Sequence, residues 1–590
     1  MARNKYNVDE DLDQEFSFAQ FKRAFFYIKR YKKLFFGAFM FSLISSVLGL
    51  LMPLFTENAI DVFIPAKDVK SLIFCGIALV AIVVAQAFCG RFRSRCTALA
   101  GQAIIRDIRH DLYVHLQDLP FDYFDSRPHG KILVRVVNYV NSVSDFLTNG
   151  LINIVLQFIN LILITIFMLV ENAKLSLLVF AGLPIFAVYI FFMRTKQRRA
   201  WRMQANKHSN FTAYLAESIN GEHVTQSFSR EEFNENINKD LAQAARKSYL
   251  HATTLNHIMW PTTMMISRSI YYLIYLFGCI WLRSTLTVGN LVAMTSYANR
   301  FWQPIMGLSN QYNQMINTAS YLERIFQLMD EKVTVTDKEG AFELPEIKGQ
   351  VDFENVVFEY EKDRPILKNI SFHVDAGQSI ALVGPTGAGK STIINLVSRF
   401  YNLKSGAVKI DGYDIADATL KSIRSQMGIM LQDTFIFSGT IMENIRYGRL
   451  DATDEECIEA AKRVYADNFI MKMPNGYETV INERGDMLSA GQRQLLSFAR
   501  TLLSDPKILI LDEATSSIDT NTELLVQEGI KELLHNRTSF VVAHRLSTIK
   551  DCDCILYINN GIITERGSHD ELMTKKGDYY ELYTSQLTND

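Results

Sequence analysis

Six long apolar stretches in the first half of the chain constrain its fold more than any other feature. A helix of about 20 mostly apolar residues crosses the hydrocarbon core of a bilayer. Stretches of that length lie near residues 34–56, 71–92, 146–170, 175–193, 258–282 and 288–308. The second contains the run SLIFCGIALVAIVVAQAFCG, whereas the sixth is the most polar. The sequence therefore predicts a membrane domain of six helical spans.

Basic residues flank these stretches unevenly. FKRAFFYIKRYKK precedes the first, RFRSR follows the second and RTKQRRAWR follows the fourth, whereas the opposite connections carry fewer lysines and arginines. Because Lys and Arg are enriched in cytoplasmic loops, we expect both termini inside. The N-terminus, MARNKYNVDEDLDQEF, lacks the layout of a cleaved signal peptide. Aromatic and basic residues interleave in 16–33, which favours a helix lying in the cytoplasmic interface.

Two connections on the predicted inner side, 93–145 and 194–257, are too long for simple loops. They contain charged, helix-favouring sequence such as QAIIRDIRHDLYVHLQDL. We expect helices that continue from the spans well into the cytoplasm. The alternative is that these segments are solvated spacers.

Several polar side chains interrupt the spans. Asn153, Gln157 and Asn160 recur at spacings of four and three, which places their amides on one face of a helix. Such a stripe binds a neighbouring helix or lines a polar cavity. Arg268 and Arg300 are ionisable residues at membrane depth and are therefore functional candidates. The alternative for each arginine is an internal partner or a position nearer the interface.

The second half of the chain has a different character. A polar stretch punctuated by Gly and Pro, residues 326–349, separates the spans from residues 350–590, which alternate like a soluble α/β protein. The net charge of −2 gives no general attraction for nucleic acid, so no nucleic-acid partner is expected. The seven cysteines are scattered without a disulfide or zinc framework, which indicates reduced thiols.

A phosphate-binding motif lies early in this half. In IALVGPTGAGKST an apolar run is followed by G-x-x-x-x-G-K-S, the strand-to-helix pattern of a phosphate loop. Glycines let the loop amides converge on phosphate oxygens, the lysine supplies a point charge, and the serine hydroxyl can ligate Mg²⁺. The loop consists of Gly384, Pro385, Thr386, Gly387, Ala388, Gly389, Lys390, Ser391 and Thr392.

Two adjacent carboxylates follow a second apolar run, KILILDEAT. Phosphoryl transfer depends mainly on positioning and charge stabilisation. We therefore expect Asp512 to hold the shell of Mg²⁺, and Glu513 to orient or deprotonate the attacking water. The alternative is that the two carboxylates are solvated acids without a function. The presence of a phosphate loop in the same half of the chain argues against this alternative.

These motifs and the six spans resemble an ATP-binding cassette (ABC) exporter half-transporter, and the resemblance covers nearly the whole chain. It implies a membrane α-helical bundle, six spans with long cytoplasmic helical extensions, followed by an α/β P-loop ABC-type ATPase domain. The implied divisions are a cytoplasmic N-terminus with an interfacial elbow helix, a transmembrane domain, a linker and a nucleotide-binding domain, at residues 1–33, 34–325, 326–349 and 350–590.

The resemblance also implies roles for single residues. Tyr360 in VVFEY resembles the aromatic residue that stacks on adenine, and Gln432 in LQDTFIFSGT resembles the glutamine that contacts Mg²⁺. Asp519 in SSID resembles the aspartate that communicates across the dimer. His544 in VVAHRLST resembles the switch histidine that reads the γ-phosphate. A core tyrosine and a loop glutamine are the alternatives for the first two.

Three further segments match parts of such exporters. The segments near Pro120–Asp125 and Glu217–Val224 resemble the transverse coupling helices that transmit movement of the nucleotide domain to the spans. Residues 483–485 (Glu-Arg-Gly) resemble the exporter loop that precedes the signature motif.

The signature motif itself departs from the usual LSGGQ. Ser489, Gly491 and Gln492 are retained, but Ala490 replaces the central glycine. An added Cβ can restrict the backbone or crowd the approach to the nucleotide of a second subunit. Two interpretations follow: a homodimer that tolerates the change, or a heterodimer in which Ala490 contributes to the weaker of two sites. The second is slightly favoured.

The function expected from the resemblance is ATP-driven export of a hydrophobic or amphipathic substrate, with ATP and Mg²⁺ as cofactors. A lipid flippase or a peptide exporter of the same architecture is the alternative, and a soluble ABC ATPase acting on nucleic acid or the ribosome is a remote one. The protein is expected in a bacterial cytoplasmic membrane, in contact with lipid. Its candidates for contact with substrate are Asn153, Gln157, Asn160, Arg268 and Arg300.

Overall fold

The computed structural model describes residues 19–127, 129–281, 286–361, 363–430, 434–482, 485–512, 520–542 and 546–587. It divides into two compact units. One comprises Met1–Gln117 and His129–Glu331, and the other comprises Asp118–Pro128 and Lys332–Asp590. The second unit thus takes in a short segment from the first half of the chain, which the predicted division at 326–349 did not anticipate.

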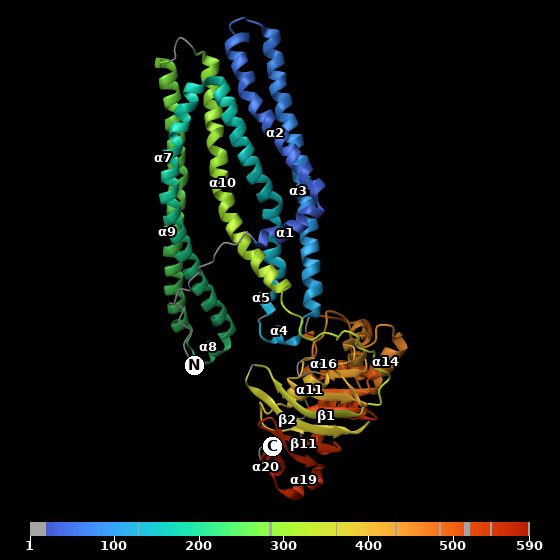
Figure 1. Ribbon diagram of the computed structural model, residues 1–590. Coiled ribbons are helices and arrows are strands. Elements are labelled where there is room, and N and C mark those ends of the chain that lie inside the picture. The colour runs from blue at the N-terminus through green and yellow to red at the C-terminus, as the bar shows by residue number, and fades with distance from the viewer. Residues whose placement is uncertain are drawn as a thin grey trace. The chain divides into compact units, whose positions relative to one another are not determined.

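The first unit is helical (Figure 1). Three single π-helical turns, at 59–63, 135–139 and 146–150, interrupt its α-helices. The α-helices are α1 (Ala19–Arg30), α2 (Lys32–Asn58), α3 (Val69–Asp118), α5 (His129–Val134), α6 (Val140–Asp145), α7 (Leu151–Asn220), α8 (Glu222–Ser227), α9 (Glu231–Trp281) and α10 (Val288–Met329).

Among the described residues, four helices are long and apolar enough to cross a membrane: Lys32–Phe63, Val69–Asp118, Ile132–Asn220 and Glu231–Ile280. The third changes direction within α7 (Figure 1). The break lies at Asn172, whose extended backbone (φ −159°, ψ 107°) separates two helical parts of α7. The Asn172 side chain accepts hydrogen bonds from the next backbone amides, Lys174 N and Leu175 N, and so starts the second part. The predicted spans at 146–170 and 175–193 therefore lie in one element with a break between them.

The sixth predicted span lies in α10, which is helical but too polar to be among those four. It packs against α7 and α2, and its Tyr297 is fully buried and donates a hydrogen bond to Leu50 O of α2 at 2.9 Å. Packing of this kind against apolar helices explains why a more polar sequence sits in the bundle. Its crossing of the membrane remains a prediction.

The long connections on the predicted inner side are helical, as expected. α3 continues 26 residues beyond the predicted end of its span at 92, to Asp118, and α9 begins at Glu231, well before the predicted span at 258. The second of the predicted transverse segments is shifted. Glu217 still belongs to α7, the chain turns at Gly221, and the short helix α8 covers Glu222–Ser227.

The predicted interfacial helix corresponds to α1, which ends at Arg30, three residues before the predicted end at 33. It is fixed to the rest of the first unit by polar contacts. Arg23 forms an ion pair with Asp330 at 2.5 Å, at the end of α10. The Tyr27 hydroxyl donates to Asp111 of α3 at 2.8 Å. These contacts join α1 to the C-terminal parts of α10 and α3.

The second unit contains two larger sheets. An antiparallel sheet has the order β2-β1-β4-β5, and a six-stranded sheet has the order β12-β11-β3-β10-β9-β6, parallel except for β12. Their strands are β1 (Val351–Glu359), β2 (Pro365–Val374), β3 (Ser379–Val383), β4 (Ser405–Ile410), β5 (Tyr413–Asp414), β6 (Met427–Met430), β9 (Ile508–Asp512), β10 (Thr538–Val542), β11 (Cys554–Asn559) and β12 (Ile562–Gly567); a separate pair is β7 (Gly439–Thr440) and β8 (Val480–Ile481).

Helices cover this sheet on both faces, so β3 is buried along its whole length. Its alternate side chains serve two cores: Ile380 and Leu382 pack in one, and Ala381 and Val383 pack in the other. The helices of the second unit are α4 (Phe121–Asp125), α11 (Lys390–Val397), α12 (Leu420–Arg424), α13 (Ile441–Arg446), α14 (Asp454–Arg463), α15 (Asp467–Ile470), α16 (Ala490–Leu503), α17 (Thr520–Leu534), α18 (Leu546–Lys550), α19 (His569–Lys575) and α20 (Asp578–Leu587).

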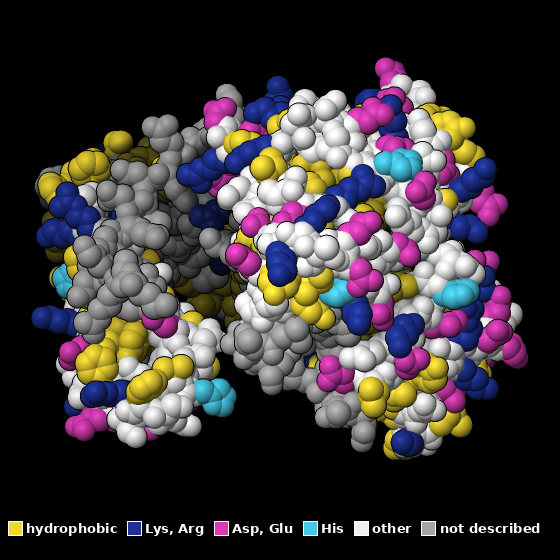
Figure 2. Space-filling view, turned by 90° about the horizontal axis from the view of Figure 1, so that it is seen from below, with side chains coloured by type: hydrophobic (Ala, Val, Ile, Leu, Met, Phe, Trp, Pro, Cys, Tyr) yellow, Lys and Arg dark blue, Asp and Glu magenta, His cyan; other side chains and the backbone are white. Residues whose placement is uncertain are grey.

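Charged side chains of both signs are intermingled on the face seen in Figure 2.

The boundary between the units lies close to the predicted linker. α10 ends at Met329, four residues beyond the predicted end of the membrane domain at 325, and β1 begins at Val351. The seven cysteines are all free thiols, as predicted.

Candidate functional site

The phosphate loop connects the buried strand β3 to the helix α11. Gly384 follows β3 with φ +145°, and a Cβ there would lie 2.0 Å from the carbonyl oxygen of Ile558. Gly389 adopts φ +109° at the N-cap of α11, a conformation that residues with side chains rarely adopt. Both glycines are therefore required by the backbone, and the loop ends on the amide groups that begin a helix.

Two side chains at the start of α11 face the loop and the neighbouring strand end. Lys390 Nζ donates to the carbonyl oxygens of Gly384 at 2.8 Å and Pro385 at 3.0 Å. Burial lowers the pKa of Lys390 from its ordinary value, and the Asp512 carboxylate opposes that shift. The Ser391 hydroxyl lies 3.4 Å from Asp512 Oδ2 at the end of β9. The structure thus brings Asp512 together with Lys390 and Ser391, although more than a hundred positions separate it from them in the sequence.

Tyr360 comes directly after β1 and is 43% exposed. Its hydroxyl lies 3.3 Å from the Thr392 hydroxyl of α11, so its ring stands beside the phosphate loop. An exposed ring in this position is available for stacking, whereas a core tyrosine would be buried.

The signature residues occupy the start of α16. Ser489 is the N-cap, and its hydroxyl accepts from Gln492 N at 3.2 Å while Gln492 Oε1 accepts from Ser489 N at 2.9 Å. This capping box fixes the first turn of the helix. Ala490 is the first helical residue, is exposed, and is not among the residues with positive φ. The methyl group therefore does not strain the backbone, and only crowding by a bound partner is left as its possible effect.

Several predicted site residues lie outside the described residues: Gln432, Glu483, Arg484, Glu513, Asp519 and His544. Their chain neighbours show where they attach. Glu513 follows Asp512 at the end of β9, and residue 543 follows β10, the strand between β9 and β3.

The short helix α4 packs within the second unit, although it lies in the first half of the sequence. The rings of Phe121 and Phe400 are 4.3 Å apart between centroids, and the Tyr401 hydroxyl donates to Asp125 Oδ2 at 2.8 Å. Burial and the bond to Asp125 raise the pKa of Tyr401. The Tyr401 ring also contacts the ring of Tyr360 at 5.1 Å. One tyrosine thus touches both α4 and the residue beside the phosphate loop.

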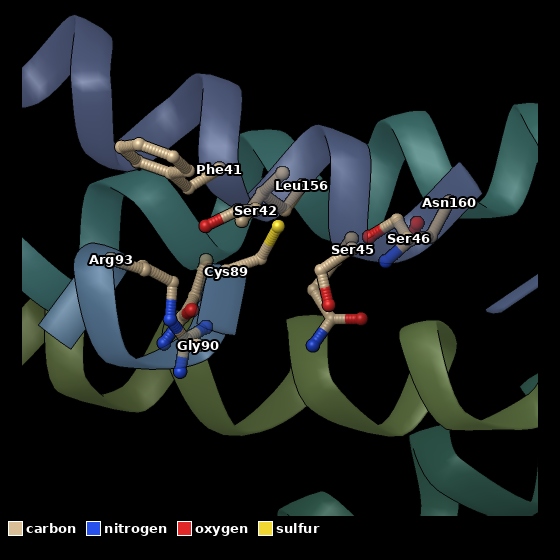
Figure 3. A pocket seen from close by; sticks show the side chains of 11 residues that line it. Phe41, Ser42, Ser45, Ser46, Cys89, Gly90, Arg93, Leu156 and Asn160 are labelled. Atoms are coloured by element: carbon tan, nitrogen blue, oxygen red, sulfur yellow. The ribbon is translucent and has the colours of Figure 1, made fainter. Parts of the chain in front are cut away.

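The first unit contains a polar cavity between α2, α3 and α7. Figure 3 shows Ser42 and Ser45 of α2, Arg93 of α3 and Asn160 of α7 around it. Asn153 and Gln157 also line it, so the predicted amide stripe faces a cavity as well as helices. An adjoining cavity reaches α10 and is lined by Gln157, Asn160, Arg300 and Gln303, among others.

The structure separates Arg268 from the other candidates. Arg268 is exposed on α9, in a shallow depression lined by residues of that helix such as Met264 and Tyr272. Arg93, in contrast, escaped the sequence analysis because it belongs to the basic segment that follows the second span. Its position in α3 one turn after Cys89, just beyond the apolar part of the helix that also contributes Gln86, was the available signal.

Comparisons with known proteins agree with this geometry. The family described as ABC transporter transmembrane region matches residues 35–305, and that described as ABC transporter matches residues 367–516. The chain is 40% identical to the uncharacterized ABC transporter ATP-binding protein YknV of Bacillus subtilis (strain 168) over 591 residues, which cover 100% of this chain and 98% of the relative. The chain belongs to the ABC transporter family.

Other members of the ABC transporter family are also similar. The putative multidrug export ATP-binding/permease protein YgaD of Bacillus subtilis (strain 168) is 36% identical over 584 residues, covering 96% of this chain and 99% of the relative. A fatty acid ABC transporter ATP-binding/permease protein of Mycobacterium tuberculosis (strain CDC 1551 / Oshkosh) is 35% identical over 496 residues, covering 83% and 78%. The solved structure of a bacterial Atm1-family ABC exporter with ATP bound has a TM-score of 0.78 at 30% identity, covering 94% of this chain and 98% of that one.

This ABC transporter is an integral membrane exporter that couples hydrolysis of bound ATP to transport. The predicted fold, a helical membrane domain followed by an α/β ATPase domain, is confirmed. The remote alternative, a soluble ABC ATPase acting on nucleic acid or the ribosome, is wrong because a membrane domain of the exporter type makes up the first half of the chain. Half-transporters of this kind function as dimers.

Proposed function

We propose that this exporter moves a hydrophobic or amphipathic substrate by alternating access, through the polar cavities between α2, α3, α7 and α10. The observation that carries the proposal is the amide stripe Asn153, Gln157 and Asn160, which lines these cavities inside a helical bundle. Polar side chains at membrane depth face a bundle interior or a water-filled path and not lipid. Arg300 joins the stripe there, and Arg268 has no part in this proposal.

The ATP site is proposed to use the residues that the resemblance implied. The loop amides and Lys390 would hold the phosphates, with Tyr360 against the adenine. Hydroxyl and carboxylate oxygens are the ligands that Mg²⁺ prefers, and Ser391 and Asp512 supply one of each within 3.4 Å. They would hold Mg²⁺, which supplies charge for phosphoryl transfer. Beyond the described residues, Gln432 would complete the Mg²⁺ shell, Glu513 would orient the attacking water, His544 would read the γ-phosphate, and Asp519 would communicate across the dimer.

The second chain of the dimer is proposed to be a different half-transporter. In this arrangement Ser489, Gly491 and Gln492 of one chain approach the ATP held by the other, and Ala490 adds a methyl group to that approach. The exposed position of Ala490 at the start of α16 supports an effect on the partner's nucleotide and not on the fold of its own chain. A homodimer is the competing arrangement.

The membrane orientation follows from the basic flanks. The positive-inside pattern supports termini and an ATPase domain in the cytoplasm of a bacterium. Export then runs from the cytoplasm or inner leaflet to the outside.

A lipid substrate is the second candidate, because two similar relatives are named fatty acid ABC transporters while two others are named putative multidrug export proteins. A peptide exporter of the same architecture has no comparable observation in its favour.

The test is ATP turnover of the dimer, purified through a tag on this chain and reconstituted in lipid nanodiscs, with a panel of amphipathic dyes. The proposal predicts stimulation by some of them, and loss of stimulated turnover in Glu513→Gln. Replacing the cavity residue Gln157 by Leu should weaken the stimulation, whereas Gln197→Leu, a matched change elsewhere on α7, should not. Equal stimulation of the unmodified exporter, Gln157→Leu and Gln197→Leu would refute transport through this cavity.

A further inference from the structure

The two cavities of the membrane domain adjoin each other. One has a volume of about 280 Å³ and the other about 340 Å³. Both are lined by Ser45 and Ser46 of α2 and by Gln157 and Asn160 of α7. They therefore form one polar space that four shared side chains surround.

This space is positively charged. Arg93 lines the first cavity and Arg300 lines the second, and no Asp or Glu lines either of them. Within the part of the chain that the structure describes, neither guanidinium forms an ion pair with a carboxylate. Two cations thus face a shared space without an opposite charge of their own chain.

The backbone of α2 is shaped around one of these cations. A Cβ at Gly49 would lie 3.0 Å from Arg300 Nη1 and 2.8 Å from Gln86 Nε2. Gly49 therefore allows the guanidinium and the amide to approach the helix closely. The Gln86 amide is fixed by donation to Ser45 O at 2.9 Å, and Arg300 itself is half-buried. The surroundings of Arg300 are therefore built by packing, whereas Arg93 is exposed at the edge of the first cavity.

Arg300 is a half-buried cation within a predicted span, where a charge without a counter-charge is costly, and an anion that enters the space lowers that cost. Arg93, exposed just beyond the second predicted span, adds positive charge at the mouth of the same space. Guanidinium groups bind carboxylate and phosphate oxygens through paired, charge-assisted hydrogen bonds. The amide groups of Asn153, Gln157 and Asn160 can donate further bonds to the same anion. The chemistry of the lining therefore suits an acidic group better than a neutral or basic one.

We propose that the transported substrate is an anionic amphiphile, whose carboxylate or phosphate group binds between Arg93 and Arg300. The inference rests on the proposed function, since it takes the cavity as the transport path. Two sources supply such a group: a free amphiphile such as a fatty acid, or an anionic phospholipid of the bilayer.

The experiment uses the dimer, purified through a tag on this chain, in nanodiscs of phosphatidylcholine. Three probes share one medium-length alkyl chain and end in a carboxylate, its methyl ester or an amine. Stimulation of ATP turnover is titrated with each. A second set of nanodiscs contains phosphatidylglycerol and no added probe, so that stimulation there identifies a lipid headgroup as the source.

The inference predicts that the carboxylate acts at a lower concentration than the ester or the amine. In Arg93→Gln and Arg300→Gln the half-maximal concentration of carboxylate rises at least about tenfold, toward that of the ester, while the values for the ester stay close to those of the unmodified exporter. Arg300→Lys keeps the charge and recovers part of the preference. Arg95→Gln, an exposed arginine of α3 that lines neither cavity, leaves all three titrations unchanged.

Equal or stronger action of the amine, or an unchanged preference for carboxylate in both glutamine variants, would overturn the inference while the exporter proposal stands. No stimulation by any probe or lipid, together with no response in the dye panel, would instead refute the proposed transport path and the inference with it. Stimulation by phosphatidylglycerol alone supports the inference and assigns the lipid source.

Discussion

The methyl group of Ala490 projects from the first residue of α16, exposed and in helical geometry. Its own chain therefore tolerates it, and we expect any effect of the methyl group to act on the nucleotide held by the second chain. We expect Ala490→Gly to change the melting temperature by little, since a glycine in the first helical turn costs at most about 1 kcal/mol. ATP turnover of the chain purified alone should rise several-fold. Thermal unfolding and a turnover assay check the two parts, and unchanged turnover would show that Ala490 does not weaken the site.

The backbone course of the loop at 384–392 could be predicted because each of its parts has a local requirement, and phosphate binding by that loop stays a prediction. Gly384 and Gly389 adopt positive φ, and the buried run before them can only be an inner strand. Arg93 could not be predicted in the same way. Its role depends on which helix faces it, and the basic segment around it already had an explanation in membrane orientation.

At the scale of elements, the short helix α4 is connected through one tyrosine to the residue beside the phosphate loop. Tyr401 joins Asp125 of α4 to the ring of Tyr360. We expect Tyr401→Phe to keep the ring contacts and to lose the bond to Asp125, so that transport falls more than ATP turnover does. The ratio of molecules transported to ATP hydrolysed measures this in proteoliposomes. Tyr413→Phe, at an exposed tyrosine of β5, is the matched control, and an unchanged ratio for Tyr401→Phe would exclude a coupling role.

Another set of contacts joins three helices of the first unit at the opposite end of α2 from α1. Asn290 Nδ2 donates to Glu57 Oε1 at 2.6 Å and to Glu171 Oε1 at 2.7 Å, which links α10 to α2 and α7. Asn290→Ala leaves two carboxylates without their shared donor, at a cost of about 1–3 kcal/mol. We expect the melting temperature in detergent to fall by several degrees. Asn58→Ala, which removes only a bond to Leu54 O within α2, should have a much smaller effect; equal shifts would contradict the account.

The existence of the long helices could be predicted from hydropathy, whereas their ends could not. α7 contains two predicted spans because a single residue, Asn172, breaks it. The shift of the second transverse segment from 217–224 to 222–227 has a similar cause, since the turn at Gly221 and not the apolar pattern decides where α8 begins. Capping and turning are decided by one or two residues, so a pattern averaged over a helix does not locate them.

At the scale of the whole molecule, we expect the identity of the second half-transporter in the dimer to decide how ATP is used. If this chain pairs with a different half-transporter, ATP turnover of the chain purified alone in nanodiscs should be no higher than that of Glu513→Gln, although both bind ATP. Vigorous turnover that Glu513→Gln abolishes would mean that the chain works as a homodimer and that Ala490 supports catalysis.

The central claim is that hydrolysis of ATP drives a substrate through the cavity between α2, α3, α7 and α10. The most direct test is ATP-dependent accumulation of a fluorescent medium-chain fatty acid in inside-out membrane vesicles that contain the dimer. The account predicts accumulation with Mg²⁺ and ATP, none with Glu513→Gln, and a reduced rate with Arg300→Gln. Accumulation of the fatty acid that Glu513→Gln does not reduce would contradict the account. ATP turnover without accumulation of the fatty acid or of any dye in the amphipathic panel would also contradict it.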